Sequence, residues 1–114
     1  MTPGRWLEKI RDFCLRLPGT VEKSSFGHPN FAAGRIYAAV EEYGGRPSVC
    51  VLSTKVEQAR RVDGVRCFAP PYVAAKGWIG VWLDAKPAWR EVAELLRAAH
   101  GLALEPRLRP PRRR

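Results

Sequence analysis

The sequence predicts an α+β domain, in which an antiparallel β-sheet carries its helices packed on one face. Apolar residues recur at helical spacing near both ends of the chain, in residues 6–17 and 89–99. Between them, short strand-like segments are separated by glycine and proline turns. The segment 78–83 (Trp-Ile-Gly-Val-Trp-Leu) is apolar on both faces, which indicates a buried strand, and we expect it to be the central one.

The first half of the chain is expected to form one helix and four strands. The helix should begin at Thr2-Pro3, where threonine can cap and proline suits the first turn, and should end at residues 17–19. Gly44-Gly45 predicts a tight hairpin. We expect strands at residues 20–26, 31–33, 36–43 and 47–53, a turn at 27–30, and Ile36, Ala38 and Val40 facing the core.

The second half is expected to add two helices around the central strand. Thr54-Lys55-Val56-Glu57 matches a capping box, so a short helix should begin there and stop near Asp63-Gly64. The last helix should begin near Lys86-Pro87 and end at Gly101. With 114 residues, the chain fits one domain, which we place at residues 1–104, followed by a basic, disordered tail at 105–114.

The net charge favours an anionic partner. Lysine and arginine number 20 against 11 acidic residues, giving a formal charge of +9. The tail contributes +4 of this, so the preceding residues still carry +5. Such an excess favours DNA or another polyanion first, and anionic lipid or the ribosome second. The alternative is a small basic protein whose charge serves no specific partner.

No catalytic, metal or cofactor site is predicted. The three cysteines, Cys14, Cys50 and Cys67, are odd in number and lack a Cys-x-x-Cys pair, which argues against disulfides and zinc. The two histidines, His28 and His100, have no ligand at metal-binding spacing. Neither a nucleophile elbow nor a phosphate-binding loop is present. We therefore expect a protein that is not an enzyme, and, because it lacks an apolar span or leader, a cytoplasmic monomer without membrane association.

Basic residues beside turns are the candidate nucleic-acid contacts. Arg46 follows the Gly-Gly hairpin and Lys76 precedes the Gly77 corner, and we expect both on a common side of the sheet where a polyanion could lie. Tyr43 and Trp78 flank these turns and could stack on a base, whereas Trp82 and Trp89 are expected in the core. The predicted nucleic-acid-binding residues are Arg35, Arg46, Lys55, Lys76 and Trp78.

Three motifs resemble the MmcQ/YjbR family. The first is Phe-Gly-His-Pro-x-Phe at residues 26–31, preceded by Leu-Pro-Gly-Thr-x-Glu-Lys at 17–23. The second is Phe-x-Pro-Pro-Tyr-Val at 68–73 with Gly-Trp-Ile-Gly-Val at 77–81. The third is Trp-x-Glu-Val-Ala-Glu-Leu-Leu-Arg at 89–97. Together they extend the resemblance over nearly the whole chain.

The resemblance implies a compact α+β fold similar to frataxin-like and type III secretion chaperone domains, in small bacterial cytoplasmic proteins. It also implies DNA binding through two wing-like hairpins, which here would be residues 44–46 and 75–77. Two other functions stay open. A protein-interaction or chaperone-like module would expose an apolar patch around Tyr72, Val73 and Trp78, whereas an enzyme acting on a small acidic ligand would place Lys76 and His28 at a pocket rim.

Overall fold

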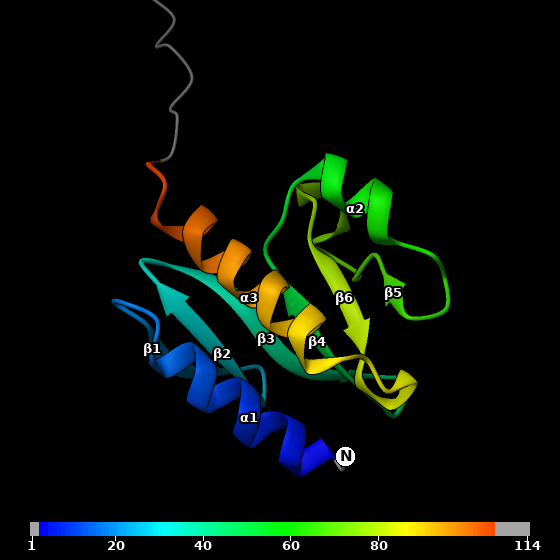
Figure 1. The fold of residues 1–114 in the computed structure, drawn as a ribbon, viewed down its shortest axis with the longest axis horizontal. Coiled ribbons are helices and arrows are strands. Elements are labelled where there is room, and N and C mark those ends of the chain that lie inside the picture. The colour runs from blue at the N-terminus through cyan, green and yellow to red at the C-terminus, as the bar shows by residue number, and fades with distance from the viewer. Residues whose placement is uncertain (1–2, 107–114) are drawn as a thin grey trace, which may run out of the picture.

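The computed structural model describes residues 3–106, which form one antiparallel sheet with α-helices (Figure 1). The sheet has six strands in the order β1-β2-β3-β4-β6-β5, so the predicted α+β class is confirmed. The predicted tail falls almost entirely outside the described residues. In chain order the elements are α1 (Pro3–Leu15), β1 (Val21–Ser25), β2 (His28–Ala33), β3 (Arg35–Tyr43), β4 (Arg46–Val51), α2 (Lys55–Arg61), β5 (Cys67–Phe68), the 3-10 turn η1 (Ala74–Lys76), β6 (Ile79–Trp82), the 3-10 turn η2 (Leu83–Ala85) and α3 (Trp89–Leu104).

Helices α1 and α3 lie together on one face of the sheet (Figure 1). Their apolar stripes supply buried residues such as Ile10 from α1 and Leu96 from α3, as the helical spacing predicted. The strands meet them with a row of paired side chains, Phe31, Ala38, Val51 and Ile79, all buried. The opposite face of the sheet carries neither helix. The core is therefore one-sided, and the second face is left for other contacts.

Strand β6 is an interior strand but not the central one, so that prediction was wrong. It lies fifth in the sheet, between β4 and the two-residue β5, whereas β3 and β4 hold the middle. The second face of β6 is covered by aromatic rings. The ring of Phe68 lies so close to Gly80 that a Cβ added there would meet it at 2.3 Å. A segment that is apolar on both faces therefore indicates that both faces of the strand are covered, not that the strand is central.

The first hairpin turns earlier than predicted. Ser25 pairs with His28, so Phe26 and Gly27 form a two-residue turn and His28–Ala33 is one continuous strand. Phe26 and Gly27 have φ angles of 54° and 80°, the left-handed pair that a tight hairpin requires. The predicted turn at residues 27–30 is therefore a turn only at its first position.

A β-bulge changes which residues of β3 face the core. The pairing of β2 with β3 shifts between Phe31 and Ala32, which turns Tyr37 inward. Tyr37 is fully buried, and its hydroxyl lies 2.9 Å from the Thr20 hydroxyl. Ala38 faces the core as predicted, but Ile36 is 38% exposed, so its predicted inward orientation was wrong.

Helix α2 joins the sheet through polar contacts rather than through a buried stripe. Thr54 caps it, because its Oγ1 accepts a hydrogen bond from the Glu57 amide, as predicted. Gln58 Nε2 donates to the carbonyls of Ala74 and Trp78, at 2.9 and 2.8 Å. The helix therefore holds η1 and the start of β6 in place. Across the described residues, no helix is long and apolar enough to cross a membrane.

Candidate functional site

The helix-free face of the sheet is hollowed into a cavity of about 550 Å³. Its floor follows a cross-strand row in which Asn30 pairs with Ala39 and Ala39 pairs with Cys50. The segment before β6 forms one wall, and the β1–β2 hairpin forms the other. Because the walls come from distant parts of the chain, the cavity exists only in the folded sheet. Its lining comprises Ser25, Phe26, His28, Asn30, Ile36, Ala39, Glu41, Tyr43, Cys50, Pro71, Tyr72, Val73 and Trp78.

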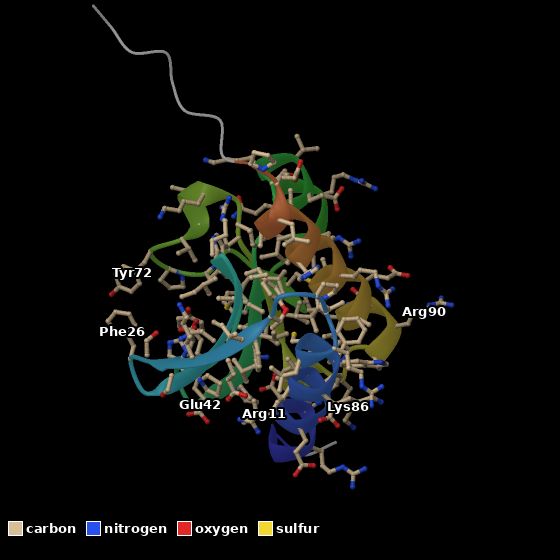
Figure 2. All side chains as sticks on the ribbon, turned by 90° about the vertical axis from the view of Figure 1, so that its left-hand side faces the viewer. Arg11, Phe26, Glu42, Tyr72, Lys86 and Arg90 are labelled. Atoms are coloured by element: carbon tan, nitrogen blue, oxygen red, sulfur yellow. The ribbon has the colours of Figure 1, made fainter. Side chains whose placement is uncertain are left out.

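Two fully exposed aromatic side chains stand at this cavity. Phe26 is 96% exposed and Tyr72 is 99% exposed, and both point from the same side of the molecule in Figure 2. Both also have left-handed backbones, with φ angles of 54° and 71°. For a bulky residue this conformation costs about 1–2 kcal/mol, which glycine avoids. Two residues that are both strained and exposed at one cavity indicate side chains placed for contact with something outside the chain.

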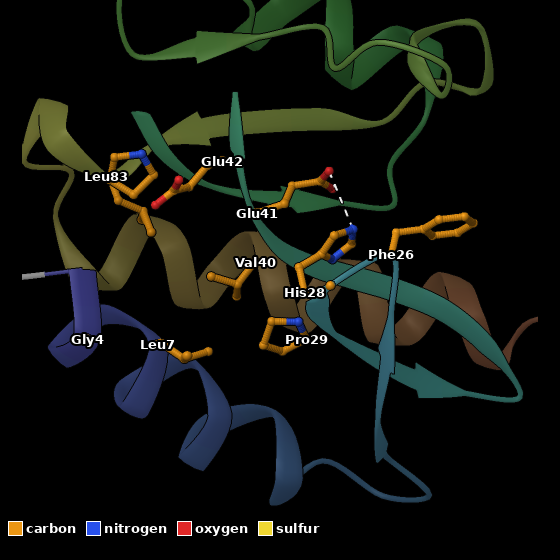
Figure 3. Close-up of a pocket in the computed structure, with 11 residues that line it drawn as sticks. Gly4, Leu7, Phe26, His28, Pro29, Val40, Glu41, Glu42 and Leu83 are labelled. Atoms are coloured by element: carbon orange, nitrogen blue, oxygen red, sulfur yellow. Dashed lines mark ion pairs between the residues drawn. The ribbon is translucent and has the colours of Figure 1, made fainter. Parts of the chain in front are cut away.

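Glu41 and His28 supply the polar groups beside the aromatic rings. His28 Nε2 lies 3.6 Å from Glu41 Oε1, and both side chains are about one-fifth exposed (Figure 3). His28 Nδ1 is buried and has no hydrogen-bond partner among the described residues. Asn30 is held by its neighbours instead, since its Nδ2 donates to Ser25 Oγ at 2.7 Å. The polar part of the cavity is thus only partly satisfied by the chain itself.

Two further ionisable groups of the cavity stay neutral. Burial raises the pKa of Cys50 to about 12, and the negative charge of Glu41 adds to this. Burial also holds the pKa of Tyr43 well above its usual range, with smaller contributions from Cys50 and Glu41. A protonated thiol is a poor nucleophile, so Cys50 is a structural residue here. The fixed charge of the cavity is therefore the carboxylate of Glu41.

A second cavity, of about 570 Å³, adjoins the first around the hairpin turn (Figure 3). The two share Phe26, His28 and Glu41 in their linings, and the second adds Glu42 and apolar residues of α1 and η2. Neither lining contains a lysine or an arginine, although the chain has 20 of them. The hollow formed by the two cavities, of which the second lies beside α1, is acidic and apolar in an otherwise basic protein, which disfavours an anionic ligand there.

Arg46, predicted as a nucleic-acid contact, is engaged within the chain. Its Nε and Nη2 donate to the two carboxylate oxygens of Asp84 at 2.9 and 2.8 Å. Its guanidinium also lies 4.1 Å from the centre of the Trp82 ring, which stacks on Phe68 at 4.0 Å. Two of its N–H donors and one face of the guanidinium are thus used within the chain, which leaves it less available to a phosphate. Trp82 is consequently half-buried on the open face rather than in the helix-covered core.

The predicted common placement of Arg46 and Lys76 was wrong. In the β4–β6 ladder Ser48 pairs with Trp82 and Val51 pairs with Ile79. Arg46 therefore lies at one end of this ladder, and Lys76 lies at the other end. The backbone next to Lys76 lies instead against that of Lys55. Gly77 is so close to it that an added Cβ would meet the Lys55 amide nitrogen at 2.8 Å.

The remaining predicted site residues divide between two places. Arg35 begins β3 at the same end of the sheet as Lys55 and Lys76. Trp78 lines the open-face cavity with Val73 and Tyr72, which forms the apolar patch that a protein-interaction module was expected to expose. Lys76 is absent from the lining that contains His28, so these two do not share a pocket rim.

Sequence reasoning missed Phe26 and Glu41 as site residues, whereas Tyr43 was expected only as a base-stacking ring beside the hairpin. Phe26 carried no clear signal, because a two-residue turn favours asparagine, aspartate or glycine at its first position. For Glu41, the predicted inward orientation of Val40 already placed the next side chain on the opposite face, but nothing in the sequence indicated that this face is hollowed. Within the described residues no group of three or more histidine, cysteine or acidic side chains could hold a metal ion.

Comparisons with known proteins decide the family. The YjbR family model matches residues 15–102. The chain belongs to the YjbR family. The crystal structure of the Deinococcus radiodurans protein DR2400, a DUF419 domain, is similar with a TM-score of 0.73 and 22% identity, over 89% of this chain and 80% of that one. At this identity the likeness shows the fold alone, and no curated protein matches this YjbR chain significantly.

Proposed function

We propose that this YjbR protein is a non-enzymatic binding module that takes up an apolar segment of a partner protein on the open face of its sheet. The observation that supports this most is the pairing of two strained, fully exposed aromatic residues, Phe26 and Tyr72, at one cavity. Aromatic side chains beside a preformed cleft are typical anchors of protein interfaces. Trp78 and Val73 extend the same apolar surface.

Site-specific photo-crosslinking tests this proposal. A benzoylphenylalanine placed at position 72 should give discrete crosslinked species in cells of the source bacterium. The matched control is position 56, where Val56 is 70% exposed on α2 and lines neither cavity. Adding Phe26→Ser to the position-72 variant should reduce the crosslinked species. Identical products from both positions, or none from position 72, would refute the proposal.

DNA binding is a second candidate, and the charge favours it. The formal charge is +9, and Arg35, Lys55 and Lys76 lie at one end of the sheet and line neither cavity. Affinity for random duplex should fall steeply with salt. The triple alanine variant of these residues should bind more weakly than Arg46→Ala, its control with an engaged arginine. Equal binding by both variants, or binding lost only when the chain ends at Leu104, would place the interaction elsewhere.

A further inference from the structure

The ion-pair partner of Glu41 differs from those of the other paired carboxylates. Four other carboxylates of the described residues pair with arginine: Glu22 with Arg11, Glu57 with Arg60 and Arg61, Asp84 with Arg46, and Glu91 with Arg66. Glu41 pairs instead with His28, whose Nε2 is 3.6 Å away, and the Tyr43 side chain also interacts with its carboxylate. The fold thus surrounds this carboxylate with a histidine and a tyrosine rather than with an arginine.

Aromatic rings surround this carboxylate. Phe26, Tyr43, Tyr72 and Trp78 all line the cavity that contains Glu41. Ring faces attract cations, and the aliphatic stem of a lysine or arginine packs well against apolar walls while its charged head reaches outward. Rings plus one carboxylate therefore form an environment suited to a cation on an apolar stem.

Within residues 3–106, no lysine or arginine lines this environment. Figure 2 places Lys86 and Arg90 on the side of the molecule opposite Phe26 and Tyr72. The hollow formed by the two cavities contains Glu41 and Glu42 and no lysine or arginine. Because the lining itself supplies no lysine or arginine, a ligand can provide the complementary charge. Charge complementarity thus distinguishes a cationic segment from an anionic one at this face.

We infer that the partner segment inserts a lysine or arginine side chain between Phe26 and Tyr72, with its charged head against Glu41. This inference rests on the proposed function and adds the chemistry of the partner. The shared position of Glu41 in both cavities leaves room for the flanking residues of the segment on either side. The partner is thus a polypeptide with a basic residue flanked by apolar ones.

An amide NMR titration at pH 7.5 tests the inference with three capped pentapeptides, Gly-Leu-X-Leu-Gly. X is lysine, norleucine or glutamate: norleucine keeps the aliphatic stem of lysine without its charge, and glutamate reverses the charge on a shorter stem. The lysine peptide should shift amides of residues 26–30, 39–43 and 72–78. Its affinity should exceed that of the norleucine peptide about fivefold, as expected for a partly buried ion pair with cation–π contact. The glutamate peptide should bind more weakly than either.

Glu41→Gln should reduce the affinity for the lysine peptide to that for the norleucine peptide and leave the latter unchanged. The matched control is Glu94→Gln, an exposed acid on α3, which should behave as wild type. The amide spectrum itself shows whether each variant is folded.

The possible outcomes distinguish a failure of this inference from a failure of the proposed function. Equal affinity for the lysine and norleucine peptides would overturn the cation site while supporting apolar docking. Binding of the lysine peptide that Glu41→Gln leaves intact would also overturn it. Failure of all three peptides to shift the named amides would overturn it as well, and the crosslinking from position 72 would then decide the proposed function separately.

Discussion

Two hairpin turns of this sheet share one backbone geometry and differ in sequence. The β1–β2 turn is Phe26-Gly27, with φ angles of 54° and 80°, and the β3–β4 turn is Gly44-Gly45, with φ angles of 58° and 79°. At the second turn glycine adopts the left-handed region freely. At the first, a phenylalanine occupies the same conformation and is 96% exposed.

The difference in sequence indicates what the residues of each turn contribute. Glycine at position 44 serves the chain path alone, and the arginine that follows is bound to Asp84 within the fold. Phe26 gains nothing from burial and adds backbone strain, which agrees with the proposed role of its ring in binding a partner. Tyr72 repeats the same combination at the other side of the cavity.

The largest stability effect is expected from Gly44→Phe, which copies the first turn onto the second. It should lower the free energy of unfolding by about 1–2 kcal/mol, because a bulky residue disfavours the left-handed region. No atom lies within 4 Å of the added Cβ, so the cost is that of the backbone. Urea denaturation measures it, with Gly44→Asn as the control that should change little. A neutral Gly44→Phe would remove the strain argument at Phe26.

The converse substitution, Phe26→Asn, should stabilise the protein by about 1 kcal/mol, since asparagine suits the first position of this turn. Thermal unfolding should show a midpoint raised by about 4 °C, given that a domain of this size gains several degrees per kcal/mol. The same variant should lose affinity for the lysine pentapeptide. A more stable variant that still binds at full strength would contradict the role of the ring.

A smaller gain is expected at the second strained aromatic. Tyr72→Gly should stabilise by about 0.5 kcal/mol, because relief of the left-handed strain is offset by the greater freedom of glycine in the unfolded chain. Urea denaturation of this variant alone and with Phe26→Asn measures both effects, which should add. Destabilisation by Tyr72→Gly would show that the tyrosine ring supports the fold.

The smallest effect is expected from Arg46→Met, at the residue that directly follows the Gly44-Gly45 turn. Arg46 lowers the pKa of Asp84 below its ordinary 3.8, so this carboxylate contributes stability above that pH and loses it as the pH falls through the lowered value. The variant should therefore differ least from wild type at pH values below that lowered pKa, where Asp84 is protonated. Both groups are exposed, so the neutral-pH difference should be slight. A large difference in stability that persists where Asp84 is protonated would contradict this.

The fold class and most elements could be predicted because they follow from local patterns. The stripes of α1 and α3, the Thr54 cap and the Gly44-Gly45 hairpin each depend on a few neighbouring residues. The first turn was misplaced because Pro29 was interpreted as a turn residue. Pro29 lies in β2 just before its pairing with β3 begins at Asn30, where a missing amide hydrogen is tolerated.

The candidate site was less accessible to sequence reasoning, because it depends on long-range register. Whether Arg46 is available depends on Asp84, which the pairing of β4 with β6 brings to it from 38 residues away. Whether Glu41 lies in a cavity depends on which face α1 and α3 cover. Basic residues were sought at turns, whereas the open face is lined by aromatics and a carboxylate.

The ring of Phe68 over Gly80 has a consequence for how the sheet ends. Strand β6 reads Ile-Gly-Val-Trp, a composition prone to fibril-like pairing when its edge is bare. Only two residues of β5 shield that edge by backbone hydrogen bonds, and Phe68, one of them, adds its ring packed on the adjacent strand. A side chain at position 80 would displace the Phe68 ring from the edge of β6. The protein would then be prone to self-association without any change in its overall charge.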